Sequence, residues 1–426
     1  MHTALLLFAL AATSADAAAP PNIILIMADD MGYEGVSAYG SPDYATPRLD
    51  KLAAEGVRFT HCYSTPICTT SRVQLMTGRY NHENYIRFGL LDPRETTFGN
   101  LLQGAGYATG VIGKWQLGGD AKTVAEFGFQ EHLLWQLEGR GSRYWEPVLT
   151  ENGKPRNDGP EVFGPDVFCD FACDFIERHR EKPFFLYYPM ALVHWPFVPT
   201  PDSPPGGSRE RLGKYDGQNG GVEYFDDMIA YMDKVVGRIV DKVDSLGLGE
   251  NTVILFTADN GCATNIVSRM GEGEIHGGKA SLPDAGTRVA FIARCPGRIA
   301  PGRVSDALVD FTDFYPTLRE AAGIEAGEGV DRSGHSLWGL LARGEEGKRP
   351  WVFCHYSRDG FPPEPKNEAK RAQLIAQMEK ERAAKKMGRF ARTQQFKLYD
   401  DGRFYDISGA VLERSDNAPG SGPPAA

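Results

Sequence analysis

The chain has 426 residues, of which 42% are hydrophobic and 24% are charged. These fractions are ordinary for a folded globular protein, and the length exceeds that of one small domain, so we predict a large domain with a smaller appendage. The formal net charge of -10 excludes nucleic acid as the main partner, because phosphate backbones bind basic surfaces. It does not exclude a small anion, which a few converging cations can hold in one cleft.

Residues 1–19 have the pattern of a secretory signal peptide. An apolar run over residues 4–12 is followed by small residues around Ala15 and Ala17. The run is shorter than the roughly 20 residues that cross a bilayer, and no later stretch reaches that length, so we expect no stable membrane insertion. We therefore predict cleavage of this segment and a periplasmic or secreted mature protein.

The seven cysteines lie at positions 62, 68, 169, 173, 262, 295 and 354, so at least one is unpaired. An oxidising compartment permits disulfides. However, Cys169 and Cys173 have the i, i+4 spacing of one helix face, which favours two small core residues over a disulfide. The spacings alone leave the pairing open.

Four short apolar runs each lead to a polar side chain. Such runs, separated by helix-like segments, are typical of a buried parallel sheet. Ligands of open α/β sheets bind outside the carboxyl ends of the strands, so these ends predict one composite site. The runs span residues 22–28, 108–113, 184–188 and 252–258, and the polar residues after them are Asp29 and Asp30, Lys114, His194, and Asp259 and Asn260.

Three helices are predicted between these strands. Thr46 is the expected N-cap of the first, with Pro47 as its first residue and Gly56 at its end. Apolar residues at helical spacing predict a second helix over residues 165–180 and a third over 222–246. The Gly- and Pro-rich segment 204–221 is either a rim over the cleft or an ordinary surface connection.

The pattern changes after about residue 347. Residues 351–356, 395–399 and 403–407 are typical of short antiparallel strands. A strongly basic, helix-like stretch over residues 366–392 lies between them, and it is either a solvated face or a contact for a polyanionic substrate. Residues 415–426 are rich in Gly, Pro and Ala and are predicted to be disordered.

The two acidic pairs at strand ends supply only oxygen ligands. Asp29-Asp30 and Asp259-Asn260 thus favour Ca²⁺ or Mg²⁺ over zinc. Each pair alone also fits a turn or a helix cap. Together they predict one shared cation.

Cys68 opens a segment with a signature pattern. The segment reads Cys68-Thr69-Thr70-Ser71-Arg72, is followed by Thr77-Gly78-Arg79, and is predicted to begin a helix. A side chain at a helix N-terminus lies in the positive end of the dipole, which suits a nucleophile that attacks an anionic ester. The alternative is a buried structural cysteine. The segment resembles the Cys-x-(Pro/Ala)-Ser-Arg signature, with its later Thr-Gly-Arg, of the type I sulfatases in the alkaline phosphatase-like superfamily.

Further elements carry the same resemblance in the family's order over residues 22–320. They are Ala28 to Gly32, Gly113 to Gly118, His194-Trp195-Pro196, Asp259-Asn260-Gly261, and Gly278-Lys279 followed by Gly286 to Val289, with a C-terminal echo in Lys397-Leu398-Tyr399 through Tyr405-Asp406. The resemblance implies an α/β fold with a large mixed, mostly parallel sheet flanked by helices and a small C-terminal antiparallel sheet. We expect the catalytic domain over residues 20–346 and the small subdomain over 347–414.

The resemblance also implies hydrolysis of a sulfate monoester, on a sulfated carbohydrate by family habit. A separate maturase would convert Cys68 to formylglycine, whose hydrate attacks sulfur with one hydroxyl and expels sulfate with the other. Ca²⁺, with Mg²⁺ as the alternative, would be the cofactor. The implied roles are metal binding for Asp29, Asp30, Asp259, Asn260 and the converted Cys68, polarisation of the nucleophile for Arg72, sulfate binding for Lys114, Lys279 and Gln116, and substrate binding with protonation of the leaving alkoxide for His194.

Three departures from the family pattern keep other functions open. Thr70 stands where the maturation motif carries proline or alanine, Gln116 replaces a histidine, and residues 281–286 differ from the usual Glu-Gly-Gly. Glutamine can hydrogen-bond but cannot take up a proton at neutral pH. The alternatives are a phosphonate or phosphodiester hydrolase of the same superfamily and a sulfoglycan-binding pseudoenzyme with unmodified Cys68. Substrate choice is expected in segments 138–160 and 204–221, which match no family motif.

Overall fold

The computed structural model describes residues 19–408, apart from 138, 140, 207–220, 327–332 and all but three residues of 361–386. Its centre is a ten-stranded mixed sheet in the order β12-β2-β11-β8-β1-β7-β3-β4-β5-β6. Neighbouring strands from β8 to β4 run parallel, whereas β11, β5 and β6 pair antiparallel. The strands are β1 Asn22–Ala28, β2 Val57–Tyr63, β3 Ala108–Lys114, β4 Glu131–Trp135, β5 Val148–Glu151, β6 Lys154–Asn157, β7 Phe184–Pro189, β8 Thr252–Ala258, β11 Arg288–Arg294 and β12 Arg303–Asp310.

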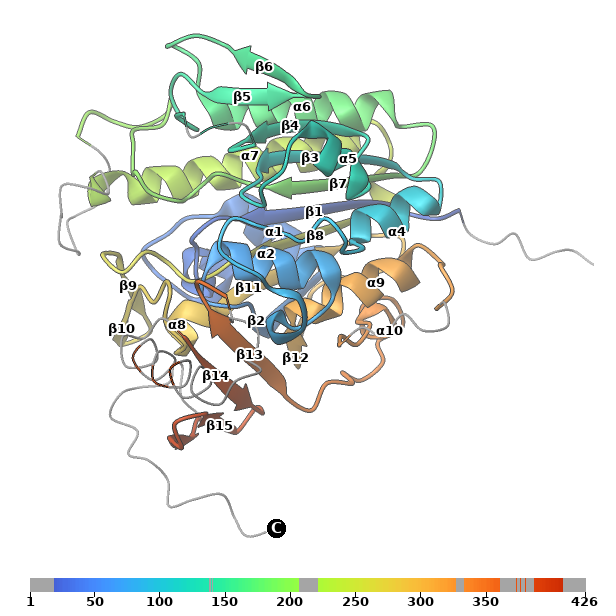
Figure 1. The fold of residues 1–426 in the computed structure, drawn as a ribbon. Coiled ribbons are helices and arrows are strands. Elements are labelled where there is room, and N and C mark those ends of the chain that lie inside the picture. The colour runs from blue at the N-terminus through green and yellow to red at the C-terminus, as the bar shows by residue number, and fades with distance from the viewer. Residues whose placement is uncertain are drawn as a thin grey trace, which may run out of the picture.

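Helices cover both faces of this sheet (Figure 1). On one face α7 packs against both α1 and α6, and on the other α2, α4 and α9 form a second group. The described helices are α1 Pro47–Ala54, α2 Cys68–Thr77, α3 Asn81–Asn84, α4 Phe98–Gly104, α5 Ala121–Glu126, α6 Gly164–Arg178, α7 Phe225–Ser245, α8 Asp284–Thr287, α9 Phe314–Ala321 and α10 Trp338–Arg343. The predicted second and third helices correspond to α6 and α7. None of the described helices is both long enough and apolar enough to cross a membrane.

The four predicted strand runs are neighbours in the sheet. They form β8, β1, β7 and β3, and every residue of these strands is buried. In the register, Leu25 of β1 lies opposite Leu255 of β8 and Tyr187 of β7. Because helices cover both faces, each residue of a strand can bury its side chain, which explains runs without polar alternation. The carboxyl ends of all four strands therefore meet at one edge, as predicted.

A small antiparallel sheet follows in the C-terminal part of the chain (Figure 1). Its strands are β13 Val352–Ser357, β14 Met387–Arg392, β15 Phe396–Tyr399 and β16 Phe404–Asp406, in that order. Three of them were predicted, but β14 corrects the helix-like interpretation of residues 366–392 at its end. The basic composition indicated a solvated helix, whereas Met387, Phe390 and Arg392 are buried in the strand. A two-stranded sheet, β9 Val267–Met270 with β10 Gly273–His276, completes the described strands.

Helix α1 is capped by a residue that is distant in the sequence. Thr46 holds the predicted N-cap position, but its side chain makes no capping hydrogen bond and lies 2.8 Å from Ser37 Oγ instead. The Asp233 carboxylate on α7 accepts from the backbone amides of Arg48 and Leu49 over 3.0 and 2.8 Å. The first amides of a helix lack partners within it, so Asp233 satisfies them.

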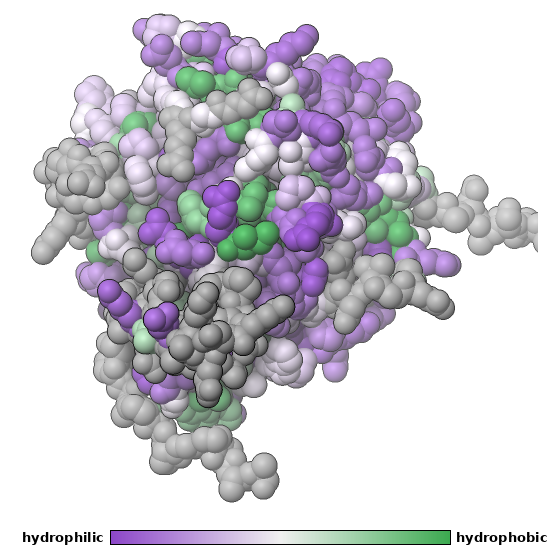
Figure 2. Space-filling view, viewed as in Figure 1, coloured by the Kyte–Doolittle hydropathy of each residue, from purple (hydrophilic) through white to green (hydrophobic). Residues whose placement is uncertain are grey.

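All seven cysteines are free, and Cys169 is buried in α6 with Cys173 half-buried beside it, as the spacing favoured. Among the described residues, the molecular face seen in Figure 1 is mostly hydrophilic, with apolar side chains in small separate patches (Figure 2). Several predictions fall outside the described residues. These are the signal peptide up to residue 18, most of segment 204–221, most of the basic stretch before residue 387, and the tail 415–426.

Candidate active site

The acidic floor of the site comes from two neighbouring parallel strands. Asp29 and Asp30 follow β1, and Asp259 and Asn260 follow β8. The backbone amide of Asp30 donates to Asp259 Oδ1 over 3.0 Å, and the Asn260 side-chain amide donates to Asp30 Oδ1 over 2.8 Å. All four residues are at most 1% exposed. Buried carboxylates remain charged only beside cations, so the acidic floor requires positive neighbours.

Lys114 and Arg72 supply positive charge from one side. Lys114 ends β3, and its Nζ lies 2.9 and 2.7 Å from the two carboxylate oxygens of Asp29. Arg72, fully buried in α2, donates to Asp259 over 3.0 Å. Burial raises the pKa of Asp29, but the Lys114 ammonium and its basic neighbours outweigh burial and lower it. Burial and Asp29 raise the pKa of Asp259 to about 7, although Arg72 opposes the shift.

Lys279 and His194 approach from the other side. Lys279 Nζ donates to Asp30 over 2.5 Å and lies 2.9 Å from His194 Nε2. His194 Nδ1 lies 2.6 Å from the carbonyl oxygen of Trp195. Burial, with Lys279 and Lys114 nearby, lowers the pKa of His194 to about 3 although Asp30 raises it. The imidazole is therefore neutral at pH 7, with Nδ1–H donating to the carbonyl and Nε2 accepting from Lys279.

The acidic floor fits a hard cation. Its donors are carboxylate oxygens and one amide oxygen, Asn260 Oδ1, which is buried and has no hydrogen-bond partner among the described residues. Ligand atoms of Asp29, Asp30 and His194 lie within 4.8 Å of one another. Oxygen-rich sets of this kind bind Ca²⁺ or Mg²⁺. The pKa of Asp259, which burial and then the Asp29 charge raise, points the same way, because a cation would stabilise the ionised carboxylate.

Cys68 is the first residue of α2 and lies beside these groups, as predicted. Its side chain is buried, and burial raises the pKa of the thiol although Lys114 and Lys279 oppose the shift. The unmodified thiol is thus protonated at neutral pH and is a poor nucleophile. Thr70, in the same first turn of α2, donates its hydroxyl to the Ile67 carbonyl over 2.8 Å, so the residue that differs from the family motif is accommodated by the fold.

Cys68 opens into a cavity of about 460 Å³, the Cys68 cavity. Lys114, Gln116, His194 and Lys279 line it, whereas Arg72 does not and lies below among the acidic side chains. Its lining residues are Ile67, Cys68, Phe88, Lys114, Gln116, Trp135, Gln136, Gly141, Arg143, His194, Trp195, Lys279 and Arg358.

Left-handed backbone gathers around the cavity. Asp30, Gln116, Gln136 and Ala280 have φ values of 58°, 55°, 64° and 66°. This conformation costs non-glycine residues roughly 1 kcal/mol or more each and tends to occur at functional sites. The glycine before Lys114, Gly113, has a φ of 123° and passes so close to the Pro189 carbonyl that a Cβ would lie 2.0 Å from its oxygen. These backbone conformations fix the directions of the side chains at and next to the Cys68 cavity.

A sequence model described as Sulfatase matches residues 21–324. The chain belongs to the sulfatase family. It is similar to human arylsulfatase A, with 34% identity over 388 residues, 83% of this chain and 73% of the relative. It is similar to the N-acetylgalactosamine-6-O-sulfatase of Bacteroides thetaiotaomicron, with 30% identity over 382 residues, 70% of this chain and 72% of the relative.

Solved structures show the same fold. A sulfatase from Pseudoalteromonas sp. gives a TM-score of 0.67 at 24% identity, over 89% of this chain and 78% of that chain. A structure in complex with its substrate D-glucosamine-2-N,6-O-disulfate gives 0.70 at 22% identity, over 91% of each chain. The fold predicted from the sulfatase resemblance is confirmed, and the chain is a sulfuric ester hydrolase by family.

Sequence reasoning missed three polar residues of the cavity in this sulfatase. Gln136 follows β4, Arg143 lies in the loop between β4 and β5, and Arg358 follows β13. Arg143 falls inside segment 138–160, where substrate choice was expected. No pattern singled it out, because only the folded loop brings its guanidinium to within 3.9 Å of Asp29.

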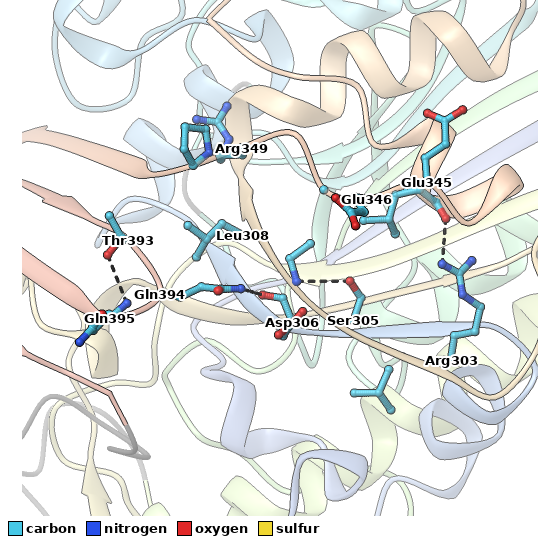
Figure 3. Close-up of a pocket in the computed structure, with 15 residues that line it drawn as sticks. Arg303, Ser305, Asp306, Leu308, Glu345, Glu346, Arg349, Thr393, Gln394 and Gln395 are labelled. Carbon is cyan, nitrogen blue, oxygen red and sulfur yellow. Dashed lines mark hydrogen bonds between the residues drawn. The ribbon is translucent and has the colours of Figure 1, made fainter.

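A larger hollow of about 690 Å³ lies between β12, α10 and the turn that joins β14 to β15 (Figure 3). None of the predicted site residues lines it. Its polar groups bond one another: Gln394 Nε2 donates to the Asp306 carbonyl over 2.8 Å, and Arg303 donates to the Leu340 and Leu341 carbonyls over 2.9 and 3.0 Å. In the Cys68 cavity, by contrast, Gln116 Oε1, Gln136 Oε1 and Arg143 NH1 are buried and have no hydrogen-bond partner among the described residues.

Proposed function

We propose that this protein hydrolyses sulfate monoesters of a sulfated carbohydrate, with a formylglycine made from Cys68 as nucleophile. The observation that carries the proposal is the meeting of Cys68, at a helix N-terminus, with Lys114, His194 and Lys279 in one cavity. The names of the relatives, arylsulfatase A and N-acetylgalactosamine-6-O-sulfatase, support a sulfate ester and, for the second, a sulfated sugar.

The acidic floor would hold Ca²⁺, or Mg²⁺ in its place, together with an oxygen on the converted Cys68. Asp29, Asp30, Asp259 and Asn260 supply the protein ligands. When bound, the cation supplies Lewis acidity that polarises the nucleophile and a sulfate oxygen. Arg72 fixes Asp259 from below and so positions the ligand set, rather than touching substrate from the cavity wall.

The remaining side chains bind sulfate and move a proton. Lys114 and Lys279 hold sulfate oxygens and balance the charge that accumulates in the transition state. Gln116 Oε1, which has no partner among the described residues, accepts a hydrogen bond from a hydroxyl group of the substrate. His194 protonates the leaving alkoxide from Nε2, and this role requires the imidazolium form, which the negative charge of a bound sulfate ester favours. Lys279 keeps its own proton and charge, because burial lowers the pKa of its ammonium group but Asp30 outweighs burial and raises it.

We further propose an exported protein, periplasmic or secreted, that loses residues 1–19. A formylglycine-generating maturase is then a transient partner. The catalytic domain spans residues 20–346 and the small subdomain 347–414. The antiparallel strands β13 to β16, which begin at Val352, support this boundary.

The first test is mass spectrometry of the peptide that contains Cys68, from protein made in its native host. We expect the mass of an aldehyde in place of the thiol. Cys68→Ala should then lower kcat on a sulfate ester by more than about a thousandfold, because the nucleophile is lost. Cys173→Ala, half-buried in α6, is the matched control and should retain activity. Unmodified Cys68 throughout, or an active Cys68→Ala variant, would refute the proposed chemistry.

One competing function rests on Gln116 and Thr70, the two departures beside Cys68. A pseudoenzyme would bind sulfated glycans in the presence of Ca²⁺, with unmodified Cys68 and no turnover. A phosphonate or phosphodiester hydrolase would instead turn over those esters faster than sulfate esters. Measuring kcat/KM on matched aryl sulfate and aryl phosphonate separates the two hydrolytic activities, and glycan binding without turnover identifies the pseudoenzyme.

A further inference from the structure

Arg143 is a buried cation that lines the Cys68 cavity and has no role in the proposed mechanism. The residue is only 9% exposed, and its NH1 atom has no hydrogen-bond partner among the described residues. NH1 lies 3.9 Å from a carboxylate oxygen of Asp29, and Lys114 already donates two hydrogen bonds to that carboxylate. A buried charged donor left unsatisfied is costly, so its position calls for a ligand.

The loop around Arg143 holds the guanidinium in place. Its Cζ lies 4.0 Å from the centre of the Trp135 ring, and Trp135 Nε1 donates to the Gly141 carbonyl over 2.7 Å. The neighbouring Tyr144 hydroxyl lies 2.5 Å from the carbonyl oxygen of His194, which ties the loop to the proton-transfer residue. Stacking on an aromatic face leaves the planar N–H edge free to bind an oxyanion with two parallel hydrogen bonds.

Arg143 is the cation that remains after the other charged groups of the site are paired. Below the cavity, the carboxylates of Asp29, Asp30 and Asp259 match the cations Arg72, Lys114 and Lys279 one for one. Arg143 comes in addition to these balanced pairs. A substrate that brings negative charge into the cavity would therefore find one cation already oriented and not committed to a protein carboxylate.

We propose that Arg143 is a substrate-binding residue of this site and holds an oxyanion of the substrate. The inference rests on the proposed sulfatase function and adds a specificity determinant to it. The oxyanion is either the scissile sulfate or a second anionic substituent on the same sugar. Gln116 Oε1 and Gln136 Oε1, also buried without partners among the described residues, face the same cavity and accept hydrogen bonds from hydroxyl groups next to that anion.

The test uses the full mature protein in Ca²⁺-containing buffer, with inorganic sulfate as the first probe. Arg143→Met keeps an apolar stem on Trp135 and removes the charge, whereas Arg143→Lys keeps the charge. Arg94→Gln removes a charge from an exposed arginine that pairs with Asp92 and is the matched control. Calorimetric titration should show sulfate affinity about tenfold or more lower in Arg143→Met, intermediate in Arg143→Lys, and unchanged in the control.

Turnover then distinguishes the two sources of the oxyanion. We compare kcat/KM on 4-nitrophenyl sulfate, which carries one anionic group, with that on N-acetylgalactosamine 4,6-disulfate. An equal loss on both substrates in Arg143→Met assigns Arg143 to the scissile sulfate, and a loss confined to the disulfate assigns it to a second anion. Values within twofold of the control on both substrates and in the titration would overturn the proposal, as would Arg143→Lys no better than Arg143→Met.

Failure of this inference can be told apart from failure of the proposed function. Sulfate binding needs no turnover, so an unconverted Cys68 would abolish activity in every variant and leave the titration informative. Active protein in which Arg143→Met changes neither sulfate binding nor kcat/KM on either substrate would remove Arg143 alone from the site. Thermal unfolding of each variant checks that a loss of affinity does not come from loss of the fold.

Discussion

At the scale of single residues, the site is defined by polar atoms that lack partners. Asn260 Oδ1 lies buried beside three carboxylates without a hydrogen bond among the described residues. An unsatisfied buried acceptor costs roughly 1–3 kcal/mol, and a cation would satisfy it. This atom therefore gives the most direct chemical argument for a metal in the acidic floor.

Adding Ca²⁺ to protein stripped of metal should raise its melting temperature by about 3 °C or more at saturating concentration, because the ion binds only the folded chain. Asn260→Leu, which has a similar shape and no oxygen, should lose at least half of this shift. Thermal unfolding with and without EDTA measures it, and Asn157→Leu on β6 is the control. An identical Ca²⁺ shift in Asn260→Leu would contradict the ligand assignment.

Residue type and strand position were enough to predict much of the site from sequence. Asp29, Lys114 and Asp259 stand directly after apolar runs, so their convergence followed from the rule that ligands bind at strand ends. Arg143 follows no such run, and it reaches the cavity only because its loop folds back along Trp135. Long-range loop geometry leaves no periodic signal in the sequence.

At the scale of elements, helix α1 depends on a residue distant in sequence. Asp233 on α7 accepts two of the backbone amides that begin α1, and burial raises its pKa to about 6. The local sequence, Thr46 before Pro47, predicted a cap from within the same segment. A carboxylate 185 residues from Arg48 takes the role because α1 and α7 pack together on one face of the sheet.

Asp233→Ala should lower the free energy of unfolding by about 1–2 kcal/mol, since two helix amides lose their acceptor. Urea denaturation at pH 8 measures the change with the carboxylate ionised in both states. Asp241→Ala, on the same helix but exposed and paired with Arg48 at the surface, should cost less than about 0.5 kcal/mol. Equal effects of the two substitutions would show that Asp233 does not stabilise α1 as a cap.

Strand β14 likewise depends on a partner that the local sequence does not reveal. Its residues end a stretch rich in lysine and arginine, and composition alone indicated a solvated helix. In the structure, Arg392 is buried because Asp284 accepts its hydrogen bond over 2.7 Å. A buried arginine looks like a surface arginine in sequence until its partner is known.

At the scale of the whole molecule, the C-terminal sheet is joined to the loop that carries Lys279. Asp284, on α8, accepts from Arg392 of β14 over 2.7 Å and from Lys397 of β15 over 3.0 Å. Lys397 also donates to the Leu282 carbonyl over 3.1 Å. Segment 281–286, which departs from the family pattern, is therefore the segment to which the C-terminal sheet is bound by these contacts.

These ion pairs of Asp284 should make the free energy of unfolding depend on pH in the acidic range. Burial raises the pKa of Asp284, but Arg392 and Lys397 outweigh burial and hold it well below its ordinary value. A lowered folded-state pKa stabilises the protein above the unfolded pKa of about 4, and the stabilisation is lost as pH falls from there towards the folded value. Asp284→Asn should cost about 3 kcal/mol at pH 7 and should flatten the loss of stability below pH 4.

Urea denaturation at pH 7, 4 and 3 follows both effects. Asp401→Asn is the matched control, because Asp401 pairs with Arg403 in the turn between β15 and β16 and its side chain is 40% exposed. It should change the free energy of unfolding by less than about 0.5 kcal/mol. If Asp284→Asn keeps the wild-type slope below pH 4, the ion pairs of Asp284 are not the source of the acid sensitivity.

The complete burial of α2 sets an order of events in time. All ten residues of this helix, Cys68 included, are inside the folded molecule. If Cys68 is converted as proposed, the converting enzyme would have to bind the chain before α2 has packed. Conversion and folding would then compete, and a preparation would contain converted and unconverted molecules in a ratio set by the relative rates of the two steps.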